Sequence, residues 1–202
     1  DISVSSGKWL KNIRKKLESP VAVDVKIVSS FKAKLRKYQE IGYSWLNQMT
    51  DLELGACLAD DMGLGKTVQI IAFLEYQRIE KGGKALLILP TSLIGNWEKE
   101  IEKFAPELPY QILHKSIAKN SDGMKINEDK FLYITTYKMV SKIEDLKTRK
   151  WNYMILDEAQ AIKNPGTKQT KEIKSIKAKV RIAMTGTPIE NRLGDLWSLF
   201  DF

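Results

Sequence analysis

The run between residues 60 and 67 constrains the fold of this chain more than any other part of the sequence. It reads Asp60-Asp61-Met62-Gly63-Leu64-Gly65-Lys66-Thr67. Apolar residues precede it at 56–59 and follow it at 68–74, so the pattern predicts a strand, a glycine turn and a buried helix. Because the backbone N–H groups of such a turn and the N-terminus of the next helix converge on an anion, the run predicts a phosphate-binding loop.

Two side chains at the end of this loop supply the chemistry that a nucleotide requires. Lys66 can reach the β- and γ-phosphates, and the hydroxyl of Thr67 can bind Mg²⁺. The strict phosphate-loop pattern has a third glycine where this chain has Asp60, so by that test alone the match is incomplete. The alternative is a glycine turn without a ligand, and the flanking strand and helix argue against it.

Short apolar segments alternate with amphipathic segments along the rest of the chain. The apolar segments predict strands at residues 84–89, 110–113, 132–135, 153–156 and 180–184. The amphipathic segments predict helices at residues 8–18, 35–49, 67–81, 93–104 and 167–175, with a further helix that begins near residue 191. Strands that alternate with helices indicate a mainly parallel sheet with helices on both faces, which is a three-layer α/β fold.

An acidic pair follows one of the predicted strands. Asp157 and Glu158 come directly after the apolar residues 153–156. Ligands bind at the carboxyl ends of the strands in a parallel α/β sheet, so this pair can meet the phosphate-binding loop. One carboxylate can complete the Mg²⁺ shell that Thr67 begins, and the other can orient or deprotonate an attacking water. The alternative is an ordinary pair of surface charges, and the position after a buried strand argues against it.

Small hydroxyl residues stand at the ends of three further strands. The run Thr185-Gly186-Thr187-Pro188 follows one strand and can sense the state of the γ-phosphate, although a simple Gly-Pro turn is the alternative. Thr91 and Ser92 follow a second strand, and Thr135 and Thr136 follow a third. Such hydroxyls can cap a helix, or they can bind a nucleic-acid backbone, and both interpretations stay open.

Composition narrows the function classes. The formal net charge is +8, and basic residues concentrate in segments 1–50 and 163–181, which suits a polyanionic partner or, equally, a solvated helix face. The lone Cys57 predicts a small core residue in a reducing compartment. The lone His114 excludes a histidine-based metal site. No apolar run approaches the ~20 residues that span a bilayer, so we expect no membrane partner.

Five segments, taken together, resemble a known family. They are residues 35–46, 60–67, 89–97, 157–164 and 185–191. Their order and sequence resemble the SWI/SNF-type branch of the superfamily-two helicase-like ATPases, which contains chromatin remodellers, recombination translocases and prokaryotic relatives. Asp60 is normal in that branch, and Gln160 resembles the prokaryotic members. The resemblance implies a RecA-like P-loop lobe at residues 31–202, after an N-terminal helix and lead-in segment at residues 1–30.

The resemblance also implies a role for each matching residue. Glu158 resembles the general base, Asp157 and Thr67 resemble the Mg²⁺ ligands, and Lys66 resembles a catalytic phosphate ligand. The ATP-binding set comprises Gln39, which reads adenine, and Asp61, Met62, Gly63, Leu64, Gly65, Lys66 and Thr67. The set expected to contact the DNA backbone comprises Thr91, Ser92, Thr135 and Thr136. The set expected to link hydrolysis to movement comprises Thr185, Gly186 and Thr187.

The implied activity is that of a double-stranded DNA translocase with a DNA-stimulated ATPase. Such a motor would work where the DNA is, in the cytoplasm (the prokaryotic nucleoid) or in the nucleus. Motors of this family bind ATP between two RecA-like lobes, and the second lobe supplies an arginine finger worth about 10³–10⁵ in turnover. We recognise no second lobe in residues 1–202, so we expect a monomer that hydrolyses ATP poorly without that lobe of the full-length chain. The alternatives are a strand-separating RNA or DNA helicase, or a nucleotide- or DNA-binding module without turnover.

Overall fold

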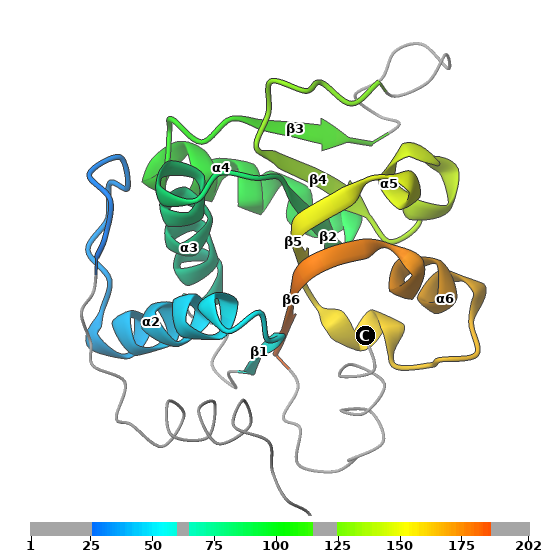
Figure 1. Cartoon of the computed structure of the whole chain (residues 1–202), viewed down its shortest axis with the longest axis horizontal. Helices are drawn as coiled ribbons and strands as arrows, with labels where there is room; N and C mark the ends of the chain where they lie inside the picture. Colours follow the sequence, from blue (N-terminus) through cyan, green and yellow to red (C-terminus); the bar gives the residue numbers. More distant parts are fainter. Residues whose placement is uncertain (1–25, 60–64, 115–124, 187–202) are drawn as a thin grey trace, which may run out of the picture.

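A parallel sheet forms the centre of the computed structural model, which describes residues 26–59, 65–114 and 125–186 (Figure 1). Its six strands in these ranges are, in sheet order, β1 (Ala56–Ala59), β6 (Lys177–Thr185), β5 (Lys150–Leu156), β2 (Ala85–Leu89), β4 (Leu132–Thr136) and β3 (Tyr110–Leu113). Every neighbouring pair is parallel. The predicted parallel sheet is therefore confirmed.

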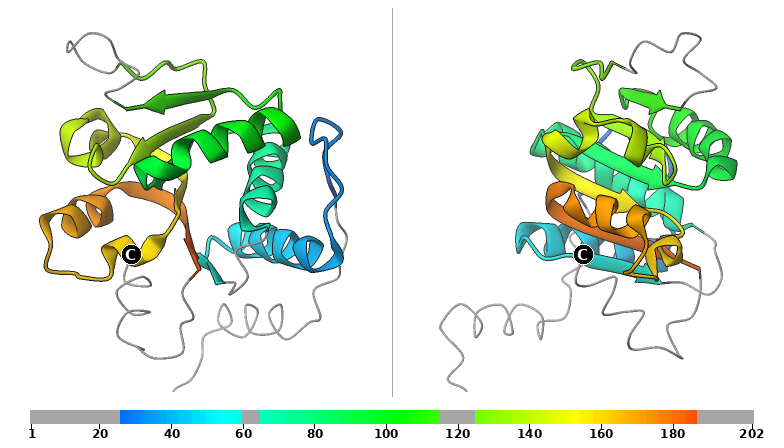
Figure 2. Two further views of the ribbon diagram at one scale, coloured as in Figure 1. Left: turned by 180° about the vertical axis from the view of Figure 1, so that it is seen from behind. Right: turned by 90° about the vertical axis from the view of Figure 1, so that its right-hand side faces the viewer.

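Helices cover both faces of the sheet (Figures 1 and 2). One face carries α2 (Lys37–Asp51), α3 (Lys66–Glu80) and α4 (Ile94–Phe104), and the other carries α5 (Asp145–Thr148) and α6 (Lys168–Ser175). Within the described residues, three single-turn 3-10 helices connect strands to these elements: η1 (Thr91–Leu93), η2 (Val140–Lys142) and η3 (Ala159–Ile162). This arrangement confirms the predicted three-layer α/β fold.

The central strands explain the two hydrophobic cores. All five residues of β2 are buried, and successive side chains point to opposite faces of the sheet. Leu87 and Leu89 belong to the core beneath α2, α3 and α4, whereas Leu86 and Ile88 belong to the core on the α6 side. A strand that is buried on both faces reads as a continuous apolar run, which is why the sequence pattern located β2 so well.

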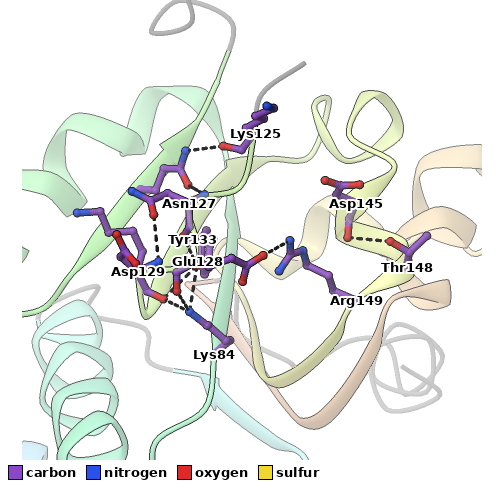
Figure 3. A network of polar contacts seen from close by, with 11 residues as sticks. Lys84, Lys125, Asn127, Glu128, Asp129, Tyr133, Asp145, Thr148 and Arg149 are labelled. Atoms are coloured by element: carbon purple, nitrogen blue, oxygen red, sulfur yellow. Dashed lines mark hydrogen bonds and ion pairs between the residues drawn. The ribbon is translucent and has the colours of Figure 1, made fainter. Parts of the chain in front are cut away.

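A polar network lies at the amino edge of the sheet, where β2 and β4 begin (Figure 3). Lys84 Nζ donates hydrogen bonds to the backbone oxygen of Glu128, to that of Lys130 at 2.6 Å and to Tyr133 Oη at 3.3 Å. Arg149 also forms an ion pair with Glu128, and this pairing lowers the pKa of the Glu128 carboxyl. The network fixes the segment before β4 at the edge opposite the predicted ligand-binding edge.

Several element boundaries differ from the predicted ones. Strands β5 and β6 begin at Lys150 and Lys177, three residues before the apolar segments, because the two strands pair in register through these exposed residues. The short helix α5 was not predicted, since four residues carry too little periodicity to detect. The helices predicted at residues 8–18 and from about residue 191 lie outside the described residues. None of the helices that the structure describes is both long and apolar enough to cross a membrane.

Candidate functional site

The carboxyl ends of three adjacent strands bring the predicted site residues together. Strand β6 lies between β1 and β5, and the register pairs Ala59 with Thr185 and Leu156 with Ala183. The predicted phosphate loop follows β1, the acidic pair follows β5, and Thr185 ends β6. The three constellations therefore meet at one edge of the sheet, as ligand sites do in parallel α/β folds.

Lys66 stands at the start of α3 with its ammonium group over the end of β6. The preceding Gly65 has φ +96°, a left-handed conformation that glycine adopts without steric cost. The side chain of Lys66 is buried, and its Nζ donates a 2.9 Å hydrogen bond to the backbone oxygen of Thr185. A phosphate that binds this ammonium group would thus act directly on the segment that ends β6.

Asp157 is fixed by contacts on both its backbone and its side chain. Its backbone N–H donates to the oxygen of Ile88, and its backbone oxygen accepts a 2.6 Å hydrogen bond from Tyr137 Oη. Its Oδ2 accepts from Trp97 Nε1, and its Oδ1 accepts from the Glu158 N–H, both at 2.8 Å. Burial raises the pKa of Asp157, and the two side-chain hydrogen bonds and the charge of Lys66 oppose that rise.

Glu158 is linked to the end of β6 through Gln160. The backbone of Glu158 has φ +50°, which is uncommon for a residue with a side chain and persists only where neighbours fix it. Gln160 Nε2 donates to Glu158 Oε2, and Gln160 Oε1 accepts a 3.1 Å hydrogen bond from Thr185 Oγ1. Thr185 therefore contacts the Lys66 ammonium group with its carbonyl and the Glu158 carboxylate, through Gln160, with its hydroxyl.

Helix α2, which precedes the predicted phosphate loop in the chain, packs closely against Gly65 near the end of that loop. Gln39 is buried, its Oε1 accepts a 2.8 Å hydrogen bond from the Arg36 N–H, and a Cβ at Gly65 would lie 2.1 Å from its Nε2. Gln69 Nε2 in turn donates to the backbone oxygen of Gly65 at 3.1 Å. The structure thus places Gln39 against the predicted nucleotide loop.

An apolar cavity of about 340 Å³ lies beside Lys66. Its walls come from α2, β1 and the start of α3, and include Tyr38, Ile41, Trp45 and Leu58. Tyr38 and Ile41 are 45% and 47% exposed, so this wall is open to solvent. Apolar and aromatic walls next to the lysine predicted to bind phosphate provide the chemistry that a nucleobase requires.

The residues predicted to contact DNA divide into two groups. Thr91 and Ser92 are exposed in η1, before the N-terminus of α4. Thr135 and Thr136 are buried at the end of β4, and Thr135 Oγ1 donates a 2.9 Å hydrogen bond to the backbone oxygen of Leu113. Neither buried hydroxyl reaches the surface in this structure. Of the four residues predicted to contact DNA, only Thr91 and Ser92 are therefore exposed for such a contact.

Some of the predicted site residues lie outside the described part of the chain. In addition, some contacts within the candidate site were not predicted. Outside it lie Asp60, Asp61, Met62, Gly63, Leu64 and Thr187. The contacts of Trp97, Tyr137 and Gln160 with the acidic pair were not predicted. Trp97 and Gln160 stand inside segments that carry the family resemblance, which was the available signal, whereas nothing in the local sequence marks Tyr137.

The donor set suits a divalent ion that is shared with a nucleotide. Asp157 supplies a carboxylate and Thr67, half-buried in the first turn of α3, supplies a hydroxyl. Within the described residues, no group of three or more His, Cys, Asp or Glu side chains could hold a metal ion alone. Mg²⁺ typically binds through one or two carboxylates together with phosphate oxygens and water, so the residues present fit that ion.

The sheet order, the loop lysine and the acidic residues after β5 define a RecA-like, nucleotide-binding class of α/β domain. A family model described as the SNF2-related domain matches residues 38–202, so this chain belongs to that family. YwqA of Bacillus subtilis is 39% identical over 208 residues, which cover 100% of this chain and 22% of YwqA. The chromatin-remodeling ATPase INO80 of Arabidopsis thaliana is 38% identical over 216 residues, which cover 100% of this chain and 14% of INO80.

Solved structures of the same family share the fold. The SWI2/SNF2 ATPase core of Sulfolobus solfataricus in complex with dsDNA matches with a TM-score of 0.78 and 46% identity, over 85% of this chain and 36% of that core. The SWI2/SNF2 ATPase core domain of Sulfolobus solfataricus also matches, with a TM-score of 0.77 and 45% identity, over 88% of this chain and 36% of that one. This chain therefore spans about a fifth of YwqA and about a third of the solved cores.

Proposed function

We propose that this chain is the ATP-binding lobe of a double-stranded DNA translocase. The observation that carries the proposal is the convergence of Lys66, Asp157 and Glu158 at one sheet edge, with Thr185 in contact with both sides of the site. ATP hydrolysis needs a cation for the phosphates, a carboxylate for Mg²⁺ and a base for water, and these residues supply all three.

In the proposed reaction, each side chain has one task. The Lys66 ammonium group leaves the Thr185 carbonyl and binds the β- and γ-phosphates, while Glu158 orients the attacking water and accepts its proton. Asp157 and Thr67 would hold Mg²⁺, which neutralises developing charge on the phosphate oxygens when it is bound. Gln39 and the apolar cavity beside Lys66 would receive the adenine base.

We also propose that the carboxyl edge binds duplex DNA through its backbone. The exposed hydroxyls of Thr91 and Ser92 stand in front of α4, where side chains and helix N-termini commonly contact phosphates. The Sulfolobus core, 46% identical to this chain, is described in complex with dsDNA. Binding to phosphates carries no sequence information, so the motor would move along duplex DNA of any sequence.

The complete site requires a second RecA-like lobe of the full-length chain. The family relatives are several times longer than this chain, and a second lobe would supply the arginine that stabilises the transition state. We propose that the full-length protein works as a monomer, because two lobes of one chain complete one site. The 202-residue chain alone should bind ATP, and it should hydrolyse ATP at least about 10³-fold more slowly than the full-length protein does.

The test compares ATP turnover by the full-length protein with duplex DNA, single-stranded DNA and single-stranded RNA. If the protein is a translocase, duplex DNA should stimulate its ATP turnover. It should also displace the third strand of a triplex without separating the two strands of the duplex. Lys66→Ala should abolish the stimulated turnover. Stimulation by single strands with duplex unwinding would instead indicate a helicase, and DNA binding without turnover would indicate a binding module.

A further inference from the structure

We propose that Trp97 is a positioning residue that fixes the Asp157 carboxylate in the orientation a divalent metal ion requires. The inference rests on the proposed function, because it takes Asp157 as a metal ligand. It adds Trp97 of α4, a residue that the proposed mechanism does not otherwise use. In this proposal Trp97 acts through Asp157, to which its indole N–H donates, and has no direct role at the nucleotide or the metal.

The contact between the two side chains is buried and direct. Trp97 Nε1 lies 2.8 Å from Asp157 Oδ2, and the two residues are 1% and 7% exposed. An indole N–H can only donate a hydrogen bond, and a buried donor without a partner costs free energy. The two residues are sixty positions apart in the sequence, and the fold brings them together. This bond therefore depends on the packing of α4 against the sheet.

The geometry explains why one extra hydrogen bond matters at this carboxylate. The last torsion of an aspartate side chain has a broad, two-fold profile, so the carboxylate plane is poorly fixed by the chain itself. Here the two oxygens accept from donors of different elements, Oδ2 from Trp97 on α4 and Oδ1 from the backbone of Glu158. Two donors on two oxygens define the plane, and each oxygen keeps a lone pair that can face a cation.

Groups that orient a metal ligand commonly control the affinity of the site. Removal of such a partner typically costs about 10- to 100-fold in metal affinity. Without the indole N–H, the Asp157 carboxylate would rotate about its last torsion, and the lone pair that faces the ion would be correctly aimed for less of the time. We therefore expect metal affinity to fall when this hydrogen bond is removed.

The chain offers a matched control for this experiment. Trp151 is also buried, 3% exposed, and its Nε1 donates a 2.9 Å hydrogen bond to the backbone oxygen of Leu146, away from the acidic pair. Trp97→Phe and Trp151→Phe therefore each remove one buried indole hydrogen bond and a similar volume. Only the first removes a bond to the proposed metal ligand.

The test measures Mn²⁺ affinity of the full-length protein with ADP by electron paramagnetic resonance, alongside thermal unfolding. Trp97→Phe should weaken Mn²⁺ binding about 10- to 100-fold, and Trp151→Phe should leave it unchanged. Benzothienylalanine at position 97 keeps the shape of tryptophan and replaces its N–H with sulfur, so it should reproduce the Mn²⁺ defect even if the phenylalanine variant unfolds.

Two results would overturn the inference, and they separate it from the proposed function. Wild-type affinity in both position-97 variants, together with a loss in Asp157→Asn, would refute the role of Trp97 and leave the metal ligand in place. Unchanged Mn²⁺ binding in Asp157→Asn would refute the metal assignment in the proposed function, and the inference would fall with it.

Discussion

At the scale of single residues, Thr185 joins the two halves of the candidate site. Its carbonyl contacts the Lys66 ammonium group, and its hydroxyl reaches Glu158 through Gln160. In the proposed function, a phosphate that binds Lys66 takes its ammonium group away from this carbonyl and so breaks one of the two contacts of Thr185. Thr185 is therefore the residue through which the state of the nucleotide can reach the segment after β6.

Thr185→Val tests that link without removing the carbonyl. Valine keeps the shape and the backbone contact to Lys66, so ATP affinity should stay near the wild-type value. The lost hydroxyl frees Gln160 and, with it, Glu158, and a hydrogen bond of about 0.5–1.5 kcal/mol corresponds to about a 2- to 10-fold lower kcat. Steady-state kinetics of the full-length protein measure both values, and a raised KM with an unchanged kcat would contradict this role.

Cys57 offers a pH-dependent measurement in the wall of the cavity. Burial raises the pKa of its thiol, and the charge of Lys66 opposes part of that rise. A raised pKa leaves less thiolate at any given pH, so alkylation by iodoacetamide should be slower than that of a free thiol at about pH 8.5 and should increase only at higher pH. ATP should slow the reaction further, and a pH profile equal to that of a free thiol would contradict the burial.

At the scale of elements, α2 and α3 interlock through two glycines. Gln39 of α2 packs on Gly65, and Gln69 of α3 packs on Gly42, where a Cβ would lie 2.0 Å from Gln69 Oε1. Gln69 also donates to the Gly65 carbonyl, so its position bears on the residue that precedes Lys66. The two glutamine side chains thus join α2 to Gly65 and to the start of α3.

Gly42→Ala should displace the Gln69 side chain and destabilise the packing of α2 against α3 and against Gly65. Overpacking costs up to about 1–3 kcal/mol, and the helix preference of alanine, about 0.5–1 kcal/mol, offsets part of this cost. ATP affinity should fall because the displaced Gln69 side chain loses its hydrogen bond to the Gly65 carbonyl. Gly95→Ala in α4 is the matched control, because a Cβ there meets nothing within 4 Å and alanine favours a helix by about 0.5–1 kcal/mol. Thermal unfolding and ATP titration check the pair, and equal behaviour of the two variants would contradict the interlock.

The sequence predicted those parts of the site that are local in the chain. A glycine turn between a strand and a helix identifies Lys66, and an acidic pair after an apolar strand identifies Asp157 and Glu158, without knowledge of the sheet order. The contact of Trp97 with Asp157 and that of Gln160 with Thr185 depend on which strands are neighbours and on how α4 packs, which no local pattern encodes.

At the scale of the whole molecule, the basic segment 163–181 does not form one patch. It starts beside the carboxyl edge, where the exposed Lys163 follows η3, and it runs through α6 to the amino edge, where Lys177 and Lys179 begin β6. Lys179 forms a 3.1 Å ion pair with Glu53 there. The positive charge that can meet DNA at the ligand-binding edge is thus only part of the surplus seen in the sequence.

Salt titration of DNA affinity tests this division of charge. Because the proposed contacts go to phosphates, the logarithm of affinity should fall linearly with the logarithm of salt concentration. Lys163→Ala should reduce that slope by about 1, the value expected for one phosphate contact. Lys179→Ala removes the same charge from the opposite edge and should leave the slope unchanged. Equal effects of the two substitutions would indicate a diffuse charge effect instead.

The most direct test of the central claim is the ATPase activity of the full-length protein with duplex DNA, measured for wild type and Glu158→Gln. We expect duplex DNA to stimulate turnover by the wild type. Glu158→Gln should bind ATP normally but lose about 10²–10⁴-fold of the stimulated turnover, the usual contribution of a general base. Turnover by Glu158→Gln at the wild-type rate would contradict the assignment of the base at this sheet edge.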